Sequence, residues 1–148
     1  MTSSANAISL PDVNVWIAAV SDRHEHHATA RRWFDSASAQ ICFCRVTQMA
    51  FLRLLTNPKV MGEDVLKPAE AIVVYRQLLT DERLRFAPEP PNIETAWLSL
   101  MDINAATGST WTDAYLAAFS LEADLRLISF DRAMRRWPGL ALEVLMPV

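Results

Sequence analysis

Three aspartates carry the strongest chemical signal in this sequence, because each stands beside a predicted strand end or helix start. Asp12 follows the apolar run ISLP, Asp131 follows the run LRLISF, and Asp113 lies in the first turn of the helix TWTDAYLAAFS. Taken singly, each acid has a structural explanation, since aspartates cap helices and accept hydrogen bonds from backbone N–H groups at helix starts. Thr110 and Asp113 even have the spacing of a capping box.

The expected topology brings these three acids together. In an open parallel sheet, ligands bind outside the carboxyl ends of the strands, where helix N-termini also point. A helix that precedes a parallel strand starts at that same edge, so Asp113 is expected beside Asp12 and Asp131. Clustered carboxylates raise one another's pKa unless a cation binds them. Oxygen ligands of this kind suit Mg²⁺ or Mn²⁺ rather than zinc.

Short apolar runs alternate with helical segments along the whole chain, which predicts βαβ units and a parallel sheet covered on both faces. The fold class is therefore one α/β domain over residues 1–148, with a four- or five-stranded, mainly parallel sheet. Residues 57–67 are expected to form a loop. Strands are expected at residues 6–10, 39–44, 84–86, 125–130 and 140–146, and helices at 13–20, 22–37, 45–57, 68–82, 93–105, 110–124 and 132–137.

Composition narrows the class of protein. A chain of 148 residues with 51% hydrophobic and 21% charged residues is typical of one folded domain. Its net charge of −3 excludes a polycation that is drawn to nucleic acid by bulk charge. No apolar run approaches the roughly 20 residues that span a bilayer, and the first residues lack a signal-peptide pattern. We therefore expect no membrane contact, a cytoplasmic location, and Cys42 and Cys44 as buried thiols.

Four blocks of the sequence resemble, in order and spacing, those of PIN-domain ribonucleases, and above all the VapC-type toxins of bacterial toxin–antitoxin pairs. The blocks are ISLPDVNVWIAAV, FCRVTQMAFLRLLTNPKVMG, TWTDAYLAAFS and LISFDRAM, so the resemblance covers nearly the whole chain. It implies a PIN-like α/β/α sandwich and an endoribonuclease that uses Mg²⁺ (or Mn²⁺). It also implies an RNA substrate, expected to be a structured RNA such as tRNA, a cognate antitoxin protein, and a homodimer.

The resemblance assigns roles to individual residues. Asp12, Asp113 and Asp131 match the family's acids and are the expected catalytic residues. Asp12 and Asp113 are expected to bind the metal ion, and Asp131 to orient the attacking water or complete the coordination. Supporting roles are expected for a polar set that comprises Asn14, Thr47, Gln48, Arg53, Thr112 and Ser129.

One departure from the family pattern leaves two functions open. The family usually carries a glutamate on the helix after the second strand, and here that position falls near Ala50. Thr47 or Gln48 could supply a neutral oxygen instead, and Arg53 could face a phosphate. The alternative to an active nuclease is a catalytically impaired PIN-fold module that holds RNA or a protein partner without cutting. A receiver domain or an aspartyl-phosphate phosphatase is disfavoured, because Lys59 and Lys67 do not follow a predicted strand.

Aromatic and basic residues near the three acids have two possible roles. Trp111 precedes Asp113 by two positions, and exposed aromatic side chains stack on unpaired bases. Most tryptophans on predicted helices belong to the core, and this is the expectation for Trp16, Trp33 and Trp97. The basic residues that follow Asp131, namely Arg132, Arg135 and Arg136, could contact an RNA backbone or form a solvated turn.

Overall fold

A five-stranded sheet forms the centre of the structure, which is a computed structural model that describes residues 8–104 and 110–147. The strand order is β3-β2-β1-β4-β5, and every neighbouring pair is parallel. The strands are β1 (Ile8–Pro11), β2 (Ile41–Phe43), β3 (Leu84–Phe86), β4 (Leu125–Ser129) and β5 (Leu142–Val144). The predicted α/β class is confirmed, with the larger of the two expected strand numbers.

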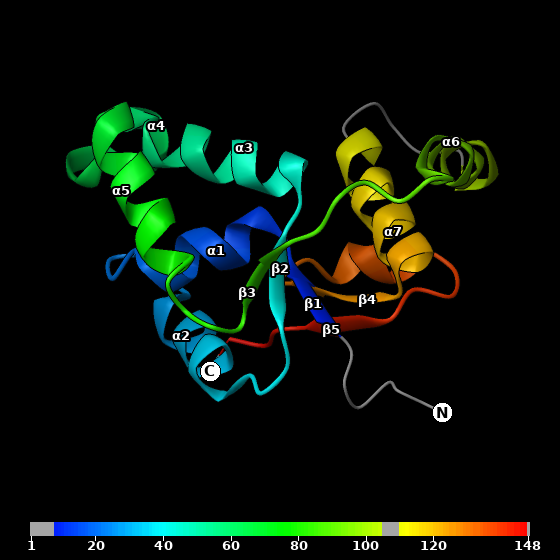
Figure 1. The fold of residues 1–148 in the computed structure, drawn as a ribbon, viewed down its shortest axis with the longest axis horizontal. Coiled ribbons are helices and arrows are strands. Elements are labelled where there is room, and N and C mark those ends of the chain that lie inside the picture. The colour runs from blue at the N-terminus through cyan, green and yellow to red at the C-terminus, as the bar shows by residue number, and fades with distance from the viewer. Residues whose placement is uncertain (1–7, 105–109, 148) are drawn as a thin grey trace.

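Helices connect the strands and lie on both faces of the sheet (Figure 1). They are α1 (Val13–Val20), α2 (His27–Ser36), α3 (Arg45–Leu55), α4 (Pro58–Met61), α5 (Pro68–Leu78), α6 (Ile93–Asn104) and α7 (Trp111–Ala123), together with the 3-10 helices η2 (Gly62–Asp64) and η4 (Arg132–Arg136). Among the described helices, none is both long and apolar enough to cross a membrane.

Alternation of side chains along the strands divides the core into two layers. Leu10, Cys42 and Leu127 point toward α6 and α7, where they pack in one buried cluster. Ile41 and Phe43 point the other way and pack with residues of α1, α2, α3 and α5, among them Trp16, which stacks on the Phe43 ring at 4.0 Å. These two layers make the expected α/β/α sandwich, and both cysteines are buried free thiols.

The strand and helix that carry Asp12 match their prediction closely. Helix α1 spans the predicted residues, and Asp12 is its N-cap, with its carboxylate accepting the N–H of Val13 at 2.7 Å. Strand β1 continues to Pro11, which was expected to stop it, because the N–H of Asp12 bonds to the Ile128 carbonyl at 2.8 Å and extends the ladder. The predicted first positions of this strand, residues 6–7, lie outside the described residues.

The predicted start of the second helix is wrong. The second helix begins at His27 rather than near Asp22, because local hydrogen bonds hold the preceding segment in turns. In these turns the N–H of His26 bonds to Nδ1 of His24 at 3.0 Å, and Nδ1 of His27 lies 2.7 Å from the Ala18 carbonyl.

The segment 57–67 was expected to be a loop, but it contains α4 and η2. Asn57 caps α4 by accepting the N–H of Lys59, and Pro58 occupies the first helical turn, where proline is favourable.

Candidate functional site

The strand order changes direction between β1 and β4, because later strands are added on opposite sides of β1. From β1 the sheet continues to β2 and β3 on one side, whereas β4 and β5 lie on the other side. The crevice outside the carboxyl ends at such a switch point is where open α/β sheets bind ligands. Asp12 follows β1 directly, and Asp131 follows β4 by two residues, so both stand at this point.

Asp12 is a half-buried carboxylate with both oxygens in use. Its Oδ1 accepts the Val13 N–H, and its Oδ2 accepts the Ser129 hydroxyl at 3.3 Å. Burial raises the pKa of the Asp12 carboxyl above its ordinary value, and the negative charges of Asp113 and Asp131 raise it further. The hydrogen bonds from Val13 and Ser129 act in the opposite direction. Asp12 therefore caps a helix and is also coupled electrostatically to the two distant acids.

Asp113 lies in the first turn of α7, and capping does not explain its position. Thr110 is the N-cap of α7, yet this helix starts without a side-chain capping hydrogen bond, so the predicted capping box does not form. Burial raises the pKa of the half-buried Asp113 carboxyl, the charge of Asp131 raises it further, and the nearby charge of Arg136 lowers it. An acid that makes no cap and lies among like charges is a poor stabiliser of the fold.

Ser129 links the two strand ends of the site. Its buried hydroxyl donates to Asp12 and accepts the N–H of Asp131 at 3.0 Å. Asp131 is exposed and caps η4, because its Oδ1 accepts the Ala133 N–H at 2.9 Å. The structure thus brings together the three predicted acids and one predicted supporting residue, Ser129.

The donor set fits a hard divalent cation. Carboxylates supply the oxygen ligands that Mg²⁺ and Mn²⁺ prefer, and mutual repulsion among Asp12, Asp113 and Asp131 is the electrostatic condition that such an ion relieves. Within residues 8–104 and 110–147, however, no group of three or more His, Cys, Asp or Glu side chains converges closely enough to hold a metal ion by itself. A site of this kind needs water to complete the coordination of Mg²⁺, which normally retains several waters.

Two predicted supporting residues on α3 are engaged in other contacts. Thr47 is buried, and its hydroxyl accepts the Cys44 N–H at 3.0 Å and lies 3.1 Å from the Cys44 carbonyl, which fixes the start of the helix. The Gln48 amide donates to the Tyr75 hydroxyl at 2.9 Å, and its oxygen accepts from Arg45. Both side chains therefore have partners outside the carboxylate set, and their supporting role stays a prediction.

The other predicted supporting residues line separate cavities. Asn14 lies on the exposed side of α1, in a hollow between α1 and the α4–η2 segment. Arg53 is exposed and lines a hollow between α3 and α5. Thr112 belongs to a cavity between α6 and α7 that is lined mainly by aromatic side chains. The supporting role of these three residues at the carboxylates stays a prediction.

Sequence reasoning missed Glu89, which also follows a strand at the carboxyl edge of the sheet. It stands three residues after β3, and its Oε2 accepts the Tyr115 hydroxyl of α7 at 2.5 Å. The rule that selected Asp12 and Asp131 would have selected Glu89 as well. The surrounding prolines, in the segment APEPPN, indicated only a turn.

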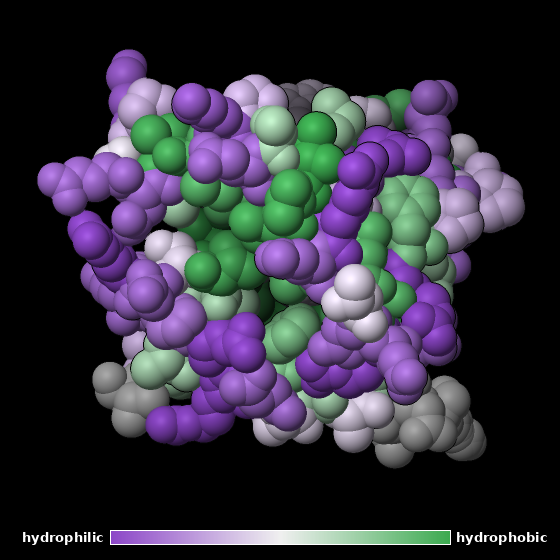
Figure 2. Space-filling view, turned by 60° about the vertical axis from the view of Figure 1, so that its left-hand side comes forward, coloured by the Kyte–Doolittle hydropathy of each residue, from purple (hydrophilic) through white to green (hydrophobic). Residues whose placement is uncertain are grey.

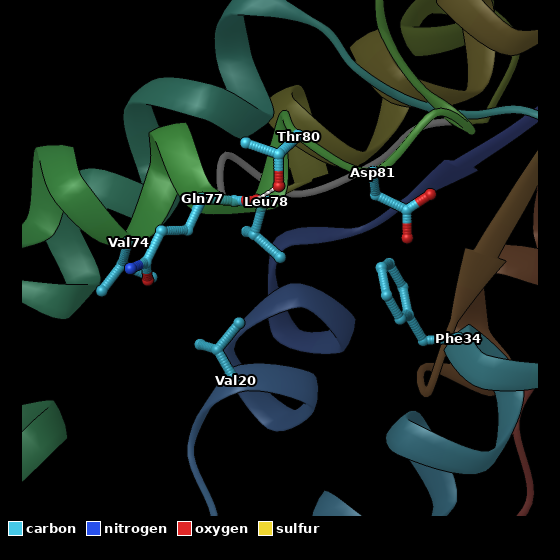
Figure 3. A pocket seen from close by; sticks show the side chains of 7 residues that line it. All are labelled: Val20, Phe34, Val74, Gln77, Leu78, Thr80 and Asp81. Atoms are coloured by element: carbon cyan, nitrogen blue, oxygen red, sulfur yellow. Dashed lines mark hydrogen bonds between the residues drawn. The ribbon is translucent and has the colours of Figure 1, made fainter.

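A further cavity among the described residues lies away from these carboxylates. It has a volume of about 580 Å³ and is lined by residues of α1, α2, α5 and the turn after α5, including Phe34, Leu78 and Asp81 (Figure 3). Asp81 precedes β3 and so lies at the amino edge of the sheet, opposite the edge that carries Asp12. The lining of this cavity therefore includes neither clustered acids nor a residue that directly follows a strand.

Comparison with known proteins agrees with this geometry. Residues 9–140 match the family model of the PIN domain. The chain is 37% identical over 142 residues to Ribonuclease VapC41 of Mycobacterium tuberculosis, covering 92% of this chain and 97% of that protein. It is 29% identical over 127 residues to Ribonuclease VapC38 of the same organism, covering 84% and 85%.

Solved structures share the fold at low sequence identity. The toxin–antitoxin complex VapBC2 from Rickettsia felis, bound to a promoter DNA fragment, superposes with a TM-score of 0.68 at 12% identity, covering 94% of this chain and 99% of that chain. Mycobacterium tuberculosis VapC20, described as a sarcin-ricin loop cleaving toxin, superposes with a TM-score of 0.67 at 19% identity, covering 89% and 95%. The chain therefore belongs to the PIN domain family, among its VapC-type members.

Proposed function

We propose that the protein is a metal-dependent endoribonuclease that cleaves RNA phosphodiester bonds as the toxin of a toxin–antitoxin module in the cytoplasm. One observation supports this most directly: three aspartates from segments far apart in the chain interact electrostatically at the switch point of a parallel sheet. The 37% identity to a named ribonuclease over most of the chain supports the same activity.

Each polar group of the site has a part in this mechanism. Asp12 and Asp113 would hold the Mg²⁺ or Mn²⁺ ion, which when bound compensates phosphodiester charge and lowers the pKa of a water. Ser129 fixes the Asp12 carboxylate by donating to Oδ2, so that its position is set before substrate arrives. Asp131 is exposed, and its Oδ1 caps η4, so its second carboxylate oxygen would be the one to orient the attacking water. Arg136, whose charge acts on Asp113, would contact the RNA backbone.

A protein partner and a homodimer are part of the same proposal. Figure 2 shows hydrophobic side chains gathered in a hollow on the side of the molecule that carries α4 and α5. Exposed apolar residues of these helices include Val60, Ile72 and Val73, with exposed fractions of 49%, 41% and 53%. Apolar surface of this kind marks interaction sites, and the solved VapBC neighbours are complexes of a toxin with its antitoxin.

The second candidate is a PIN-fold module that binds RNA or a protein partner without cutting. Two features favour it: α3 has no acid in its first turn, and the described residues hold no ready-formed metal cluster. Such a module would keep the carboxyl edge of the sheet and the apolar surface, and would lose only the cleavage of RNA.

Cleavage of a structured RNA such as tRNA, with Mg²⁺ or Mn²⁺ and with a chelator, separates the two candidates. We expect cleavage that needs the ion and that falls by at least roughly a hundredfold in Asp12→Asn and Asp113→Asn. Asp81→Asn is the matched control, because this acid lies at the other edge of the sheet. A parent protein that binds RNA but never cuts would support the binding module, and a fully active Asp113→Asn would remove this acid from the site.

A further inference from the structure

An aromatic cavity adjoins the carboxylates at the same edge of the sheet. It has a volume of about 310 Å³, and its lining comes from the first turn of α3, the segment after β3, and the facing sides of α6 and α7. The lining residues are Val46, Glu89, Trp97, Trp111, Thr112 and Tyr115. Val46 and Glu89 follow the carboxyl ends of β2 and β3, and Trp111 and Thr112 directly precede Asp113 in α7. The cavity is therefore a neighbour of the proposed cleavage site.

The aromatic rings of this cavity hold one another in place. The Trp97 ring meets Trp111 edge-on at 5.8 Å and Tyr115 edge-on at 5.7 Å. Trp97 Nε1 donates to the Trp111 carbonyl at 2.9 Å, which ties the start of α7 to α6. Trp111 nevertheless remains 45% exposed, although a tryptophan of this size is normally covered in a monomer. A fixed and exposed indole is a stacking surface.

Glu89 gives the cavity a polar edge that favours ligands with hydrogen-bond donors. Its Oε2 accepts the Tyr115 hydroxyl, which leaves the remaining carboxylate capacity as an acceptor of N–H donors. Burial raises the pKa of the Tyr115 hydroxyl, and Glu89 raises it further, so Tyr115 stays a protonated donor to this carboxylate. A carboxylate repels phosphate, and therefore the occupant presents a neutral donor edge rather than the RNA backbone.

We propose that this cavity binds one unpaired nucleobase with an exocyclic amino group, next to the phosphate that is cut. The base stacks on Trp111, and its amino group donates to Glu89, as single-stranded RNA is read by aromatic faces and base edges. Cytosine, adenine and guanine carry such an amino group, whereas uracil presents a carbonyl at the corresponding position. This proposal rests on the proposed ribonuclease function and names the part of the substrate that the site recognises.

Binding of short, labelled, single-stranded oligo-C and oligo-U RNA to the full chain tests the proposal by fluorescence anisotropy. The measurement is made with a chelator, so that no cleavage occurs. We expect oligo-C to bind at least about fivefold more tightly than oligo-U. Trp111→Ala should weaken the binding of both oligonucleotides by about fivefold to a hundredfold, whereas Trp111→Phe should keep most of the affinity for them. Leu98→Ala removes an exposed apolar side chain of α6 outside the cavity and should change nothing.

Glu89→Gln tests the polar edge separately and does not depend on the stability of Trp111→Ala. A glutamine amide offers a donor as well as an acceptor, so the preference for oligo-C over oligo-U should disappear while oligo-U affinity is kept. Unchanged RNA affinity in Trp111→Ala, or an unchanged preference in Glu89→Gln, would overturn the proposal. Weaker binding of a protein partner by Trp111→Ala, with RNA binding intact, would assign the cavity to that partner.

The result of these binding measurements can be distinguished from the result of the cleavage assay. A parent protein that never cuts but binds oligo-C through Trp111 would remove the ribonuclease function and keep the base pocket. A parent that cuts RNA equally well with and without Trp111, and binds both oligonucleotides alike, would keep the ribonuclease and remove the pocket.

Discussion

The two edges of the sheet hold aspartates in opposite electrostatic settings. At the amino edge, Asp81 accepts two hydrogen bonds from the Arg83 guanidinium, at 3.0 and 2.7 Å, and these bonds lower the pKa of its carboxyl to about 2. Arg83 also donates to the Phe34 and Ala37 carbonyls, which binds β3 to the end of α2. At the carboxyl edge, burial and neighbouring acids raise the pKa of Asp12 and Asp113.

This contrast distinguishes Asp81, whose charge stabilises the folded state, from Asp12 and Asp113, whose charges destabilise it. Asp81 has a cation within hydrogen-bonding distance, so its charge is favourable in the folded state. The carboxyl-edge acids gain partial compensation, from the charge of Arg136 at Asp113 and from hydrogen bonds at Asp12. Unfavourable electrostatics of this kind are typical of functional sites, where stability is lost in exchange for binding or catalysis.

The largest expected difference between the two edges of the sheet is in how their aspartates affect stabilisation by divalent ions. Mg²⁺ or Mn²⁺ at about a hundredfold excess over its dissociation constant should stabilise the parent protein by roughly 2.7 kcal/mol. Differential scanning fluorimetry with and without the ion measures this shift. Asp113→Asn should lose the shift and Asp81→Asn should keep it. An equal shift in all three proteins would mean that the ion binds elsewhere.

Ser129 should have the next largest effect, because it links the ends of β1 and β4. Ser129→Ala removes the donor to Asp12 Oδ2 and the acceptor for the Asp131 N–H, and should reduce cleavage by about tenfold, as loss of a residue behind a metal ligand does. Ser120→Ala is the matched control, since this buried serine of α7 donates to the Leu116 carbonyl of its own helix. Equal activity of the two variants would show that Asp12 needs no support from Ser129.

Loss of the Asp81–Arg83 pair should have a smaller effect on the free energy of unfolding, and this effect should depend on pH. The Asp81 carboxyl has a lower pKa in the folded state than in the unfolded state, so its contribution is present above the unfolded value near 4 and disappears as the pH falls toward about 2. At neutral pH Asp81→Asn should lower stability by about 1 kcal/mol, because the pair is partly exposed. Urea unfolding at several pH values should show the two proteins converge in acid, and a constant difference would refute the assignment.

Asp113→Asn should give the smallest effect, a slight gain in stability without metal. The folded state raises the pKa of this carboxyl, so its penalty is absent below the unfolded pKa and present at neutral pH, above the folded pKa. Neutralising Asp113 should therefore raise the melting temperature by about 1 °C at pH 7 with a chelator present. A lower melting temperature would show that Asp113 stabilises α7 and belongs with Asp81 rather than with Asp12.

Most of the element boundaries could be predicted because they depend on local chemistry. Asp12 caps α1, the apolar run before it forms β1, and the β–α alternation required a parallel sheet with helices on both faces. The boundaries that failed depend on a contact with another segment in one case and on an ambiguous local signal in the other. The start of α2 is set by His27, whose ring contacts the Ala18 carbonyl on α1. The helix α4 forms where Asn57 and Pro58 suggested only a break, because a proline ends one helix and begins another equally well.

The sequence by itself determined that Asp12, Asp113 and Asp131 would gather at one edge, because parallel strands share a direction and helices return to the same side. It could not decide what each acid does there, since hydrogen-bond partners from distant segments settle that. Only the tertiary structure joined Ser129 to Asp12 and Gln48 to Tyr75. Only the tertiary structure placed Glu89 against Tyr115, because contacts between residues far apart in the chain depend on how α6 and α7 pack.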